Sequence, residues 1–203
     1  MSKEVKVKVY TIDELSEEAR DRALSDWNAN SPYYVYADDA RSTIEAMEKC
    51  LGISCGRWSY DSCRSDYSIT YRHDDEVLEL KGNRARAWFW NNVAPGIFKP
   101  RTIWPKTVSV GCKRRESRMS VSCDCPWTGM CFDMDALDPV LKFMLGQDRD
   151  ETKTVRDVIE AAVSSLFDAL VADCEYQQSM EAFVGSCEAN GYTFLESGEM
   201  VNW

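Results

Sequence analysis

The chain has 203 residues, of which 44% are hydrophobic and 29% are charged, and its formal net charge is −10. This length allows one sizeable core, and no apolar run approaches the roughly 20 residues that cross a membrane. The first six residues contain no apolar signal region, so we expect a cytoplasmic protein without membrane contact. Its nine cysteines should then be reduced thiols, and their odd number argues against a complete disulfide framework.

The order of helical and strand-like patterns predicts an α+β fold, in which helices cover an antiparallel sheet and a long C-terminal helix lies in the core. No linker rich in Pro, Ser or Gly divides the chain, so we predict one domain that spans residues 1–203. The only soft joint is the stretch 146–151, Gly-Gln-Asp-Arg-Asp-Glu, which has the composition of an exposed loop.

The N-terminal part predicts one strand followed by two helices. Residues 3–10 alternate valine with lysine or tyrosine, a pattern typical of a half-buried edge strand. The two helical segments have apolar residues at three- and four-residue steps and suitable residues at their ends. They are residues 17–28, preceded by the cap candidates Thr11, Glu14 and Ser16, and residues 37–51, followed by Gly52.

The middle of the chain predicts mostly strands. The strand-like segments are 53–60, 66–73 and 76–80, with a turn at 73–75, and a hairpin of 107–113 with 118–125 that turns near Arg115 and Glu116. A short helix is predicted over 84–93, with Trp88 and Phe89 facing inward. Prolines at 95, 100 and 105 then favour an irregular loop.

The segment 152–174 is the strongest helix prediction in the chain. Its apolar residues recur at helical spacing, no Gly or Pro interrupts it, and Thr152 or Thr154 is suited to cap its start. The residues of this stripe are Val155, Ile159, Ala162, Leu166, Leu170 and Cys174. Further helices are predicted over 135–145, capped by Asp135, and over 180–190, before a closing hairpin at 192–202.

The cysteines and the single histidine carry only weak signals of chemistry. Cys112, Cys123, Cys125 and Cys131 could supply four thiolates to zinc, but the chain has no CxxC pair of the usual zinc spacing. Small buried thiols are the alternative. His73 is the only histidine, beside Asp74 and Asp75, and a solvated turn explains it as well as catalysis does. We therefore expect no cofactor and no enzyme activity.

Charge is distributed unevenly along the chain. Residues 1–81 have a net charge of −6 and residues 123–203 a net charge of −12, whereas residues 82–122 carry nine Lys/Arg against Glu116 alone, a net +8. Aromatic residues are interleaved with these cations. The candidate contact residues in this segment are Arg84, Arg86, Trp90, Arg101, Trp104, Lys113, Arg114, Arg115 and Arg118.

Three interpretations of the basic segment 84–118 stay open. Arg and Trp anchor many protein interfaces, cations with stacking rings also hold single-stranded nucleic acid, and the cations could instead pair with acidic helices of the same chain. The acidic C-terminal part offers a separate hypothesis, because carboxylates along a helix can imitate a phosphate backbone. Its candidates are Asp157, Glu160, Asp168, Asp173 and Glu175, for which a solvated helix face is the simpler explanation.

Both ends of the chain resemble a known group of proteins. Residues 10–24, Tyr-Thr-Ile-Asp-Glu-Leu-Ser-Glu-Glu-Ala-Arg-Asp-Arg-Ala-Leu, resemble the opening of small phage and prophage accessory proteins, often labelled antitoxin-like, and residues 188–199 resemble their terminal segment. The resemblance implies an accessory protein of a phage or mobile element. Such proteins frequently bind and block host machinery, including CRISPR and other defence systems.

Together these observations predict a non-enzymatic inhibitor of a host factor, such as an anti-CRISPR or other anti-defence protein, in the host cytoplasm. The expected partner is a host protein or ribonucleoprotein complex. The alternative is a nucleic-acid-binding protein that uses residues 84–118.

Overall fold

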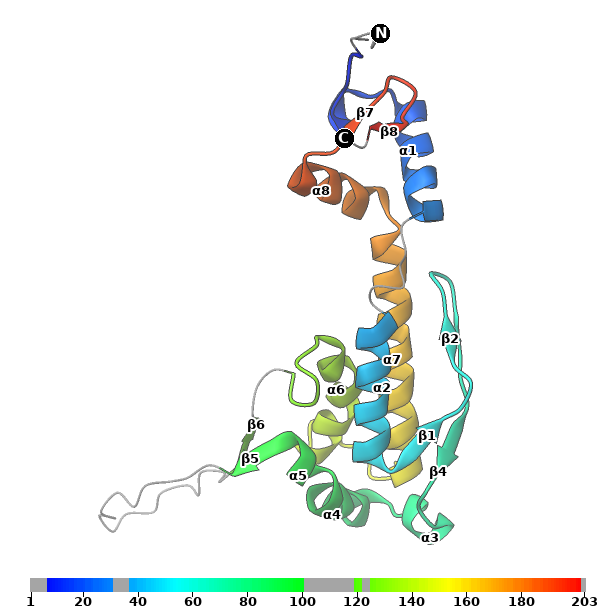
Figure 1. Cartoon of the computed structure of the whole chain (residues 1–203). Helices are drawn as coiled ribbons and strands as arrows, with labels where there is room; N and C mark the ends of the chain where they lie inside the picture. The colour runs from blue at the N-terminus through cyan, green and yellow to red at the C-terminus, as the bar shows by residue number, and fades with distance from the viewer. Residues whose placement is uncertain (1–6, 31–36, 101–118, 122–124, 202–203) are drawn as a thin grey trace, which may run out of the picture. The chain divides into compact units, whose positions relative to one another are not determined.

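A computed structural model describes residues 7–30, 37–100, 119–121 and 125–201 (Figure 1). Its contacts group into two compact units. Unit 1 comprises residues 1–37, 61–64 and 171–203, and unit 2 comprises 38–60 and 65–170. The predicted joint at 146–151 lies inside unit 2, and the assignment of the whole chain to one domain stays a prediction. The α+β class is confirmed, since helices dominate and the strands pair antiparallel.

Unit 1 brings the two ends of the chain together around a small core. Its elements are η1 (Ile12–Glu14), α1 (Glu17–Asn30), α8 (Met180–Asn190), β7 (Thr193–Phe194) and β8 (Met200–Val201). Its buried residues are Ile12, Leu15, Ala19, Ala23, Phe183, Cys187 and Phe194. Of the predicted strand over 3–10, only Tyr10 pairs, by an isolated bridge to Phe194; residues 7–9 form no strand, and residues 3–6 lie outside the described part.

Side chains at the helix ends explain where α1 and α8 begin and stop. Ser16 Oγ accepts a hydrogen bond from the amide of Ala19 at 3.3 Å, and Ser179 Oγ accepts one from the amide of Ala182 at 3.2 Å, so each serine satisfies a free amide of a first turn. Gly191 ends α8 at φ +65°, a conformation that favours glycine. The predicted helices 17–28 and 180–190 are confirmed.

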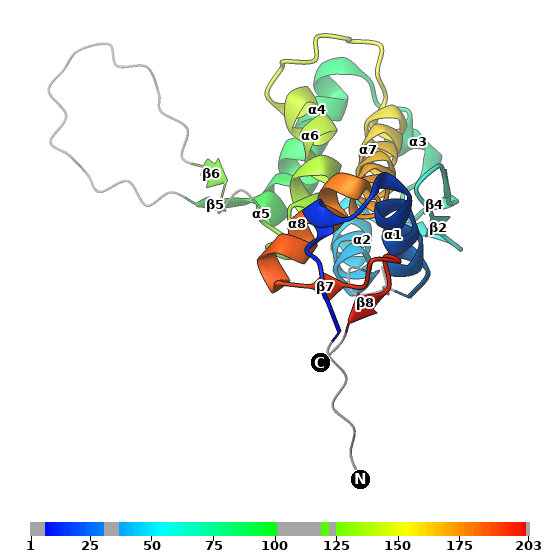
Figure 2. The same cartoon turned by 90° about the horizontal axis from the view of Figure 1, so that it is seen from above.

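Unit 2 is built around α7 (Val155–Gln177), which is yellow to orange in Figure 1. Every predicted stripe residue from Val155 to Leu170 is fully buried, so the core prediction is confirmed. Of the two cap candidates, Thr154 is the one that caps α7. Its hydroxyl accepts a hydrogen bond from the amide of Asp157 at 3.0 Å, and Asp157 Oδ2 accepts one from the amide of Thr154 at 2.8 Å. In both views α2 (Ala37–Leu51) lies beside α7, with α6 (Phe132–Met144) close by (Figure 1, Figure 2).

The remaining elements of unit 2 are short. They are β1 (Ile53–Cys55), β2 (Ser59–Tyr60), β3 (Ser65–Asp66), β4 (Ile69–Tyr71), α3 (Asp75–Leu78), α4 (Gly82–Asn92), α5 (Ala94–Ile97), β5 (Phe98–Pro100) and β6 (Met119–Val121). Among the described residues, all sheets are two-stranded: β1 with β4, β2 with β3, β5 with β6, and β7 with β8 in unit 1. The helices that the structure describes include none with the length and apolar content needed to cross a bilayer.

Three sequence predictions in unit 2 need correction. Residues 76–80 do not form a strand, because Asp74 O accepts the amides of Val77 and Leu78 and so starts the helical turn α3. Residues 94–100, predicted as the start of an irregular loop, form α5 and β5. β5 pairs with residues 119–121; residues 107–113, the predicted partner of that strand, lie outside the described part. Asp135 is not a helix cap, since α6 already begins at Phe132.

Candidate functional site

The structure describes three of the nine predicted contact residues, all on α4. The side chain of Arg84 is exposed, and those of Arg86 and Trp90 are half-buried. Arg84 forms no ion pair with any described carboxylate. The other six residues lie outside the described part of the chain: Arg101, Trp104, Lys113, Arg114, Arg115 and Arg118.

Arg86 and Trp90 are committed to contacts within unit 2. Arg86 Nε donates to the carbonyl of Phe143 at 3.0 Å, and Trp90 Nε1 donates to the carbonyl of Met144 at 3.2 Å. Both carbonyls belong to the last turn of α6; the Phe143 carbonyl also accepts a hydrogen bond from the amide of Gly146 at 3.2 Å. The guanidinium also lies 5.2 Å from the centre of the Phe143 ring. These two residues therefore fasten α4 to the C-terminal end of α6.

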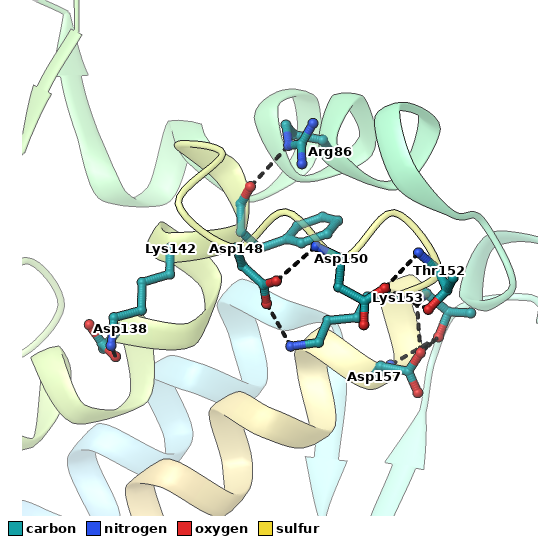
Figure 3. A network of polar contacts seen from close by, with 10 residues as sticks. Arg86, Asp138, Lys142, Asp148, Asp150, Thr152, Lys153 and Asp157 are labelled. Carbon is teal, nitrogen blue, oxygen red and sulfur yellow. Dashed lines mark hydrogen bonds and ion pairs between the residues drawn. The ribbon is translucent and has the colours of Figure 1, made fainter.

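The connection from α6 to α7 is a network of carboxylates that bind their own loop (Figure 3). Asp148 Oδ2 lies 2.6 Å from Lys153 Nζ, and its Oδ1 accepts the amide of Asp150 at 3.1 Å. Asp150 in turn accepts the amide and the hydroxyl of Thr152. The hydrogen bond from Lys153 holds the pKa of Asp148 below its usual value. This network closes a turn: Asp148 pairs with Lys153, and both carboxylates accept hydrogen bonds from the loop itself.

Asp133, at the start of α6, organises the loop 125–131. Its side chain is fully buried, and its Oδ2 accepts the amides of Trp127 at 2.8 Å and Thr128 at 2.7 Å. Its Oδ1 accepts the Thr128 hydroxyl at 2.7 Å and the hydroxyl of Thr43, on α2, at 3.3 Å. A buried carboxylate requires such donors. The loop is therefore tied both to α6 and to α2.

The loop 125–131, held by Asp133, forms one wall of a cavity of about 390 Å³. The lining comes from three parts of unit 2: one face of α2, the ends of α4 and α5, and the loop 125–131. The lining residues are Ala46, Lys49, Cys50, Asn92, Gly96, Pro126 and Trp127. Burial raises the pKa of the Cys50 thiol to about 11, and the neighbouring Trp127 indole offsets only part of that shift.

Sequence reasoning missed this cavity and the role of Asp133. The loop sequence Trp-Thr-Gly before Asp133 has the small and hydroxyl residues that fold onto a carboxylate, and this pattern was the available signal. The cavity has no comparable signal, because its lining combines helical positions with a loop that are distant in sequence.

The structure describes His73 and two of the four cysteines that were weighed as zinc ligands. His73 Nε2 lies 2.9 Å from the carbonyl of Leu51, which it bonds as the Nε2–H tautomer, and so it caps the end of α2. Cys125 is half-buried and Cys131 is exposed, while Cys112 and Cys123 lie outside the described residues. Among those that are described, no three His, Cys, Asp or Glu side chains cluster as metal ligands would.

The acidic residues of α7 are partly engaged within the chain. Asp157 caps the helix through Thr154. Glu160 accepts the hydroxyl of Tyr71 at 2.6 Å, and burial together with this carboxylate raises the pKa of Tyr71 to about 12. Asp168 and Asp173 have longer contacts with Ser164 and Gln177, whereas Glu175 is exposed. The acidic residues of α7 therefore differ from the row of free carboxylates that would imitate a phosphate backbone.

Comparison with known proteins gives no relative from which a function could be transferred: no protein-family model, curated protein or solved structure matches this chain.

Proposed function

We propose that this chain is a non-enzymatic accessory protein of phage type that binds and inhibits a host factor in the host cytoplasm. The partner is a host protein or ribonucleoprotein complex with an acidic surface, and an anti-CRISPR or other anti-defence role is the specific form of the proposal. The basic segment 84–118 makes the contact. Complementary charge at such a contact speeds association and selects the partner.

The pairing of β5 with β6 is the observation that supports this segment as a contact region. Pro100 lies opposite Met119 in the antiparallel ladder, so the two ends of the stretch 101–118 lie close together. Between these two residues the sequence contains six Lys/Arg and one acid, a net charge of +5. This positive stretch therefore begins and ends at one pair of strands, and Arg86 and Trp90 hold α4, the helix that precedes it, against the end of α6.

The aromatic contacts favour a protein partner over nucleic acid. Trp90 stacks on Phe98 with 5.5 Å between ring centres, and the Trp88 ring meets His73 edge to face at 5.0 Å. Rings used in this way are not free to stack on bases, which a single-strand binder needs from its aromatic residues. Nucleic-acid binding by residues 84–118 remains the second candidate, and the experiment separates the two.

The test combines capture of the partner with a functional readout. Tagged protein is used to pull down partners from host lysate, and it is also expressed in a host whose defence system restricts a phage. We expect a stoichiometric partner and recovery of plaque formation. Both should be lost in the triple variant Lys113→Glu, Arg114→Glu, Arg115→Glu, because three cations of the segment reverse sign.

The control is Arg57→Glu, Arg72→Glu, which reverses two exposed cations, one between β1 and β2 and one directly after β4, and should change neither readout. Gel shifts with single-stranded DNA and RNA across a salt series test the alternative. Phosphate binding weakens steeply with salt. Absence of any stoichiometric partner, with salt-dependent gel shifts instead, contradicts the proposal and supports the nucleic-acid candidate.

A further inference from the structure

The cavity beside α2 is built before any ligand arrives. Its loop wall, with Pro126 and Trp127, is tied by the buried Asp133 to both α6 and α2. Its other walls are helical, from α2, α4 and α5. At about 390 Å³ it lies within the usual size range of small-molecule sites, which are mostly pre-formed in this way.

Gly96 and Cys50 face each other across the α5 and α2 sides of the cavity lining. A Cβ on Gly96 would lie 3.3 Å from Cys50 Sγ, a contact tight enough to force the thiol to move. Cys50 is half-buried and remains a neutral thiol at neutral pH, since burial raises its pKa to about 11. This part of the lining is therefore uncharged.

Among the lining residues that the structure describes, Lys49 carries the one charge, and none is a carboxylate. Lys49 is exposed. This is unusual for a chain with a net charge of −10. Ala46, Pro126 and Trp127 supply apolar surface, and Asn92 has its amide nitrogen committed to Trp88 O at 2.8 Å, which leaves its carbonyl oxygen as a further polar group.

We propose that this cavity binds a small carboxylate with a flat apolar body, its anionic end on Lys49 and its body against Trp127 and Pro126. An ammonium and an indole or proline face are the groups that such a ligand requires. The proposal adds a small-molecule site to the chain and does not depend on the proposed host partner.

A charge series of one ring system tests the site. The probes are naphthalene-1-carboxylate, its neutral carboxamide and the cationic naphthalen-1-ylmethylammonium, titrated by calorimetry and ligand-observed NMR. We expect saturable binding of the carboxylate with a Kd of about 1 mM or tighter, as for small ligands of this size. Its binding should be about tenfold tighter than that of the carboxamide, and the ammonium should bind weakest.

Three variants on α2 locate the binding. Lys49→Gln should bring the carboxylate to the affinity of the carboxamide, a loss of about tenfold. Ala46→Trp should fill the cavity and abolish binding of both compounds. Arg41→Gln, an exposed cation elsewhere on the same helix, should leave both affinities unchanged. Circular dichroism and thermal melting establish that each variant is folded.

The result that overturns the proposal is equally specific. Equal affinity for the three probes, no saturable binding of any probe, or binding that persists in folded Ala46→Trp would each rule out an anion site in this cavity. Binding by the Lys49→Gln variant at wild-type affinity would do the same.

Discussion

At the last turn of α6, Arg86 donates a second hydrogen bond to the Phe143 carbonyl, which also accepts the amide of Gly146, and Trp90 donates one to the Met144 carbonyl. A cation at this end also interacts favourably with the helix dipole.

We predict that Arg86→Ala lowers the free energy of unfolding by about 2 kcal/mol, measured by urea denaturation. Arg84→Ala is the matched control, because Arg84 is exposed on the same helix; it should cost less than about 0.5 kcal/mol. Equal losses would contradict the role of Arg86.

The lowered pKa of Asp157 predicts that the free energy of unfolding depends on pH. Hydrogen bonds from the amide and hydroxyl of Thr154 hold its pKa below the usual value. Because the folded pKa is the lower one, the contribution of this carboxylate is complete above the unfolded pKa of about 3.9 and is lost as pH falls through the folded pKa. Asp157→Asn should therefore be less stable than wild type at pH 7.

Urea denaturation at several pH values checks this expectation. The difference between wild type and Asp157→Asn should narrow as the pH falls below about 4. Asp168→Asn, which removes only a 3.5 Å contact with Ser164, should show no comparable change with pH. A wild-type advantage at Asp157 that stays constant down to acid pH would contradict the assignment.

At the scale of elements, the loop 125–131 depends on a single carboxylate. Asp133→Asn would place an amide group opposite backbone donors, so we predict a loss of about 3 kcal/mol in the free energy of unfolding. Asp135→Asn is the matched control on the same helix. Burial and then Asp138 raise the pKa of Asp135, so its charge is disfavoured and removal should leave the protein equally or more stable. A greater loss in Asp135→Asn would refute this difference.

The hairpin of β7 and β8 depends on one glycine. Gly198 has φ +89°, and a Cβ there would overlap the carbonyl oxygen of Ala19 in α1. Gly198→Ala should therefore destabilise the protein by about 2 kcal/mol or more. Gly185, inside α8, has open space around its Cβ position, so Gly185→Ala should stabilise it by about 0.5–1 kcal/mol. Thermal melting of both variants gives the comparison, and opposite signs are required.

The longer helices could be predicted from sequence, because they have apolar residues at helical spacing and local end signals; the four-residue helices α3 and α5 could not. Val155 to Leu170 have helical spacing, and Gly52 and Gly191 have the positive φ expected after a helix. The strands could not be predicted as well, since those described are two or three residues long. Pairing of so few residues depends on contacts elsewhere in the fold, such as the stacking of Phe98, in β5, on Trp90, in α4.

The candidate site was predictable only in part. Charge pattern alone identified the basic segment, but it could not distinguish Arg84, which is exposed, from Arg86, which bonds the end of α6. That difference depends on where α6 ends relative to α4, a property of the tertiary fold. The cavity lining likewise joins Lys49 to Trp127 through Asp133 and Thr43, and no local pattern records such a contact.

For the whole molecule, charge is divided by unit as well as along the sequence. Unit 1 contains 14 acids and six bases, a net charge of −8 out of the total of −10. Unit 2 is therefore close to neutral, at −2, although it includes the basic segment. A partner with an acidic surface should be repelled by the charge of unit 1 and attracted by that of residues 84–118.

The ladder of β5 and β6 gives a prediction for the whole chain. Replacing residues 101–118 by Asn-Gly should connect Pro100 to Met119 by a two-residue hairpin turn. We expect the free energy of unfolding to change by less than about 1 kcal/mol while binding of the proposed partner is lost. Denaturation and pull-down are measured on the same variant. Global unfolding of this variant would mean that the excised residues are part of the core.

The same ladder has a consequence for how this chain could diversify. Because the two ends of the segment 101–118 are joined by paired strands, its sequence, length and charge can change while the rest of unit 2 stays the same. Lineages under pressure to follow a changing target would then vary at 101–118 and keep the residues of the β5–β6 ladder.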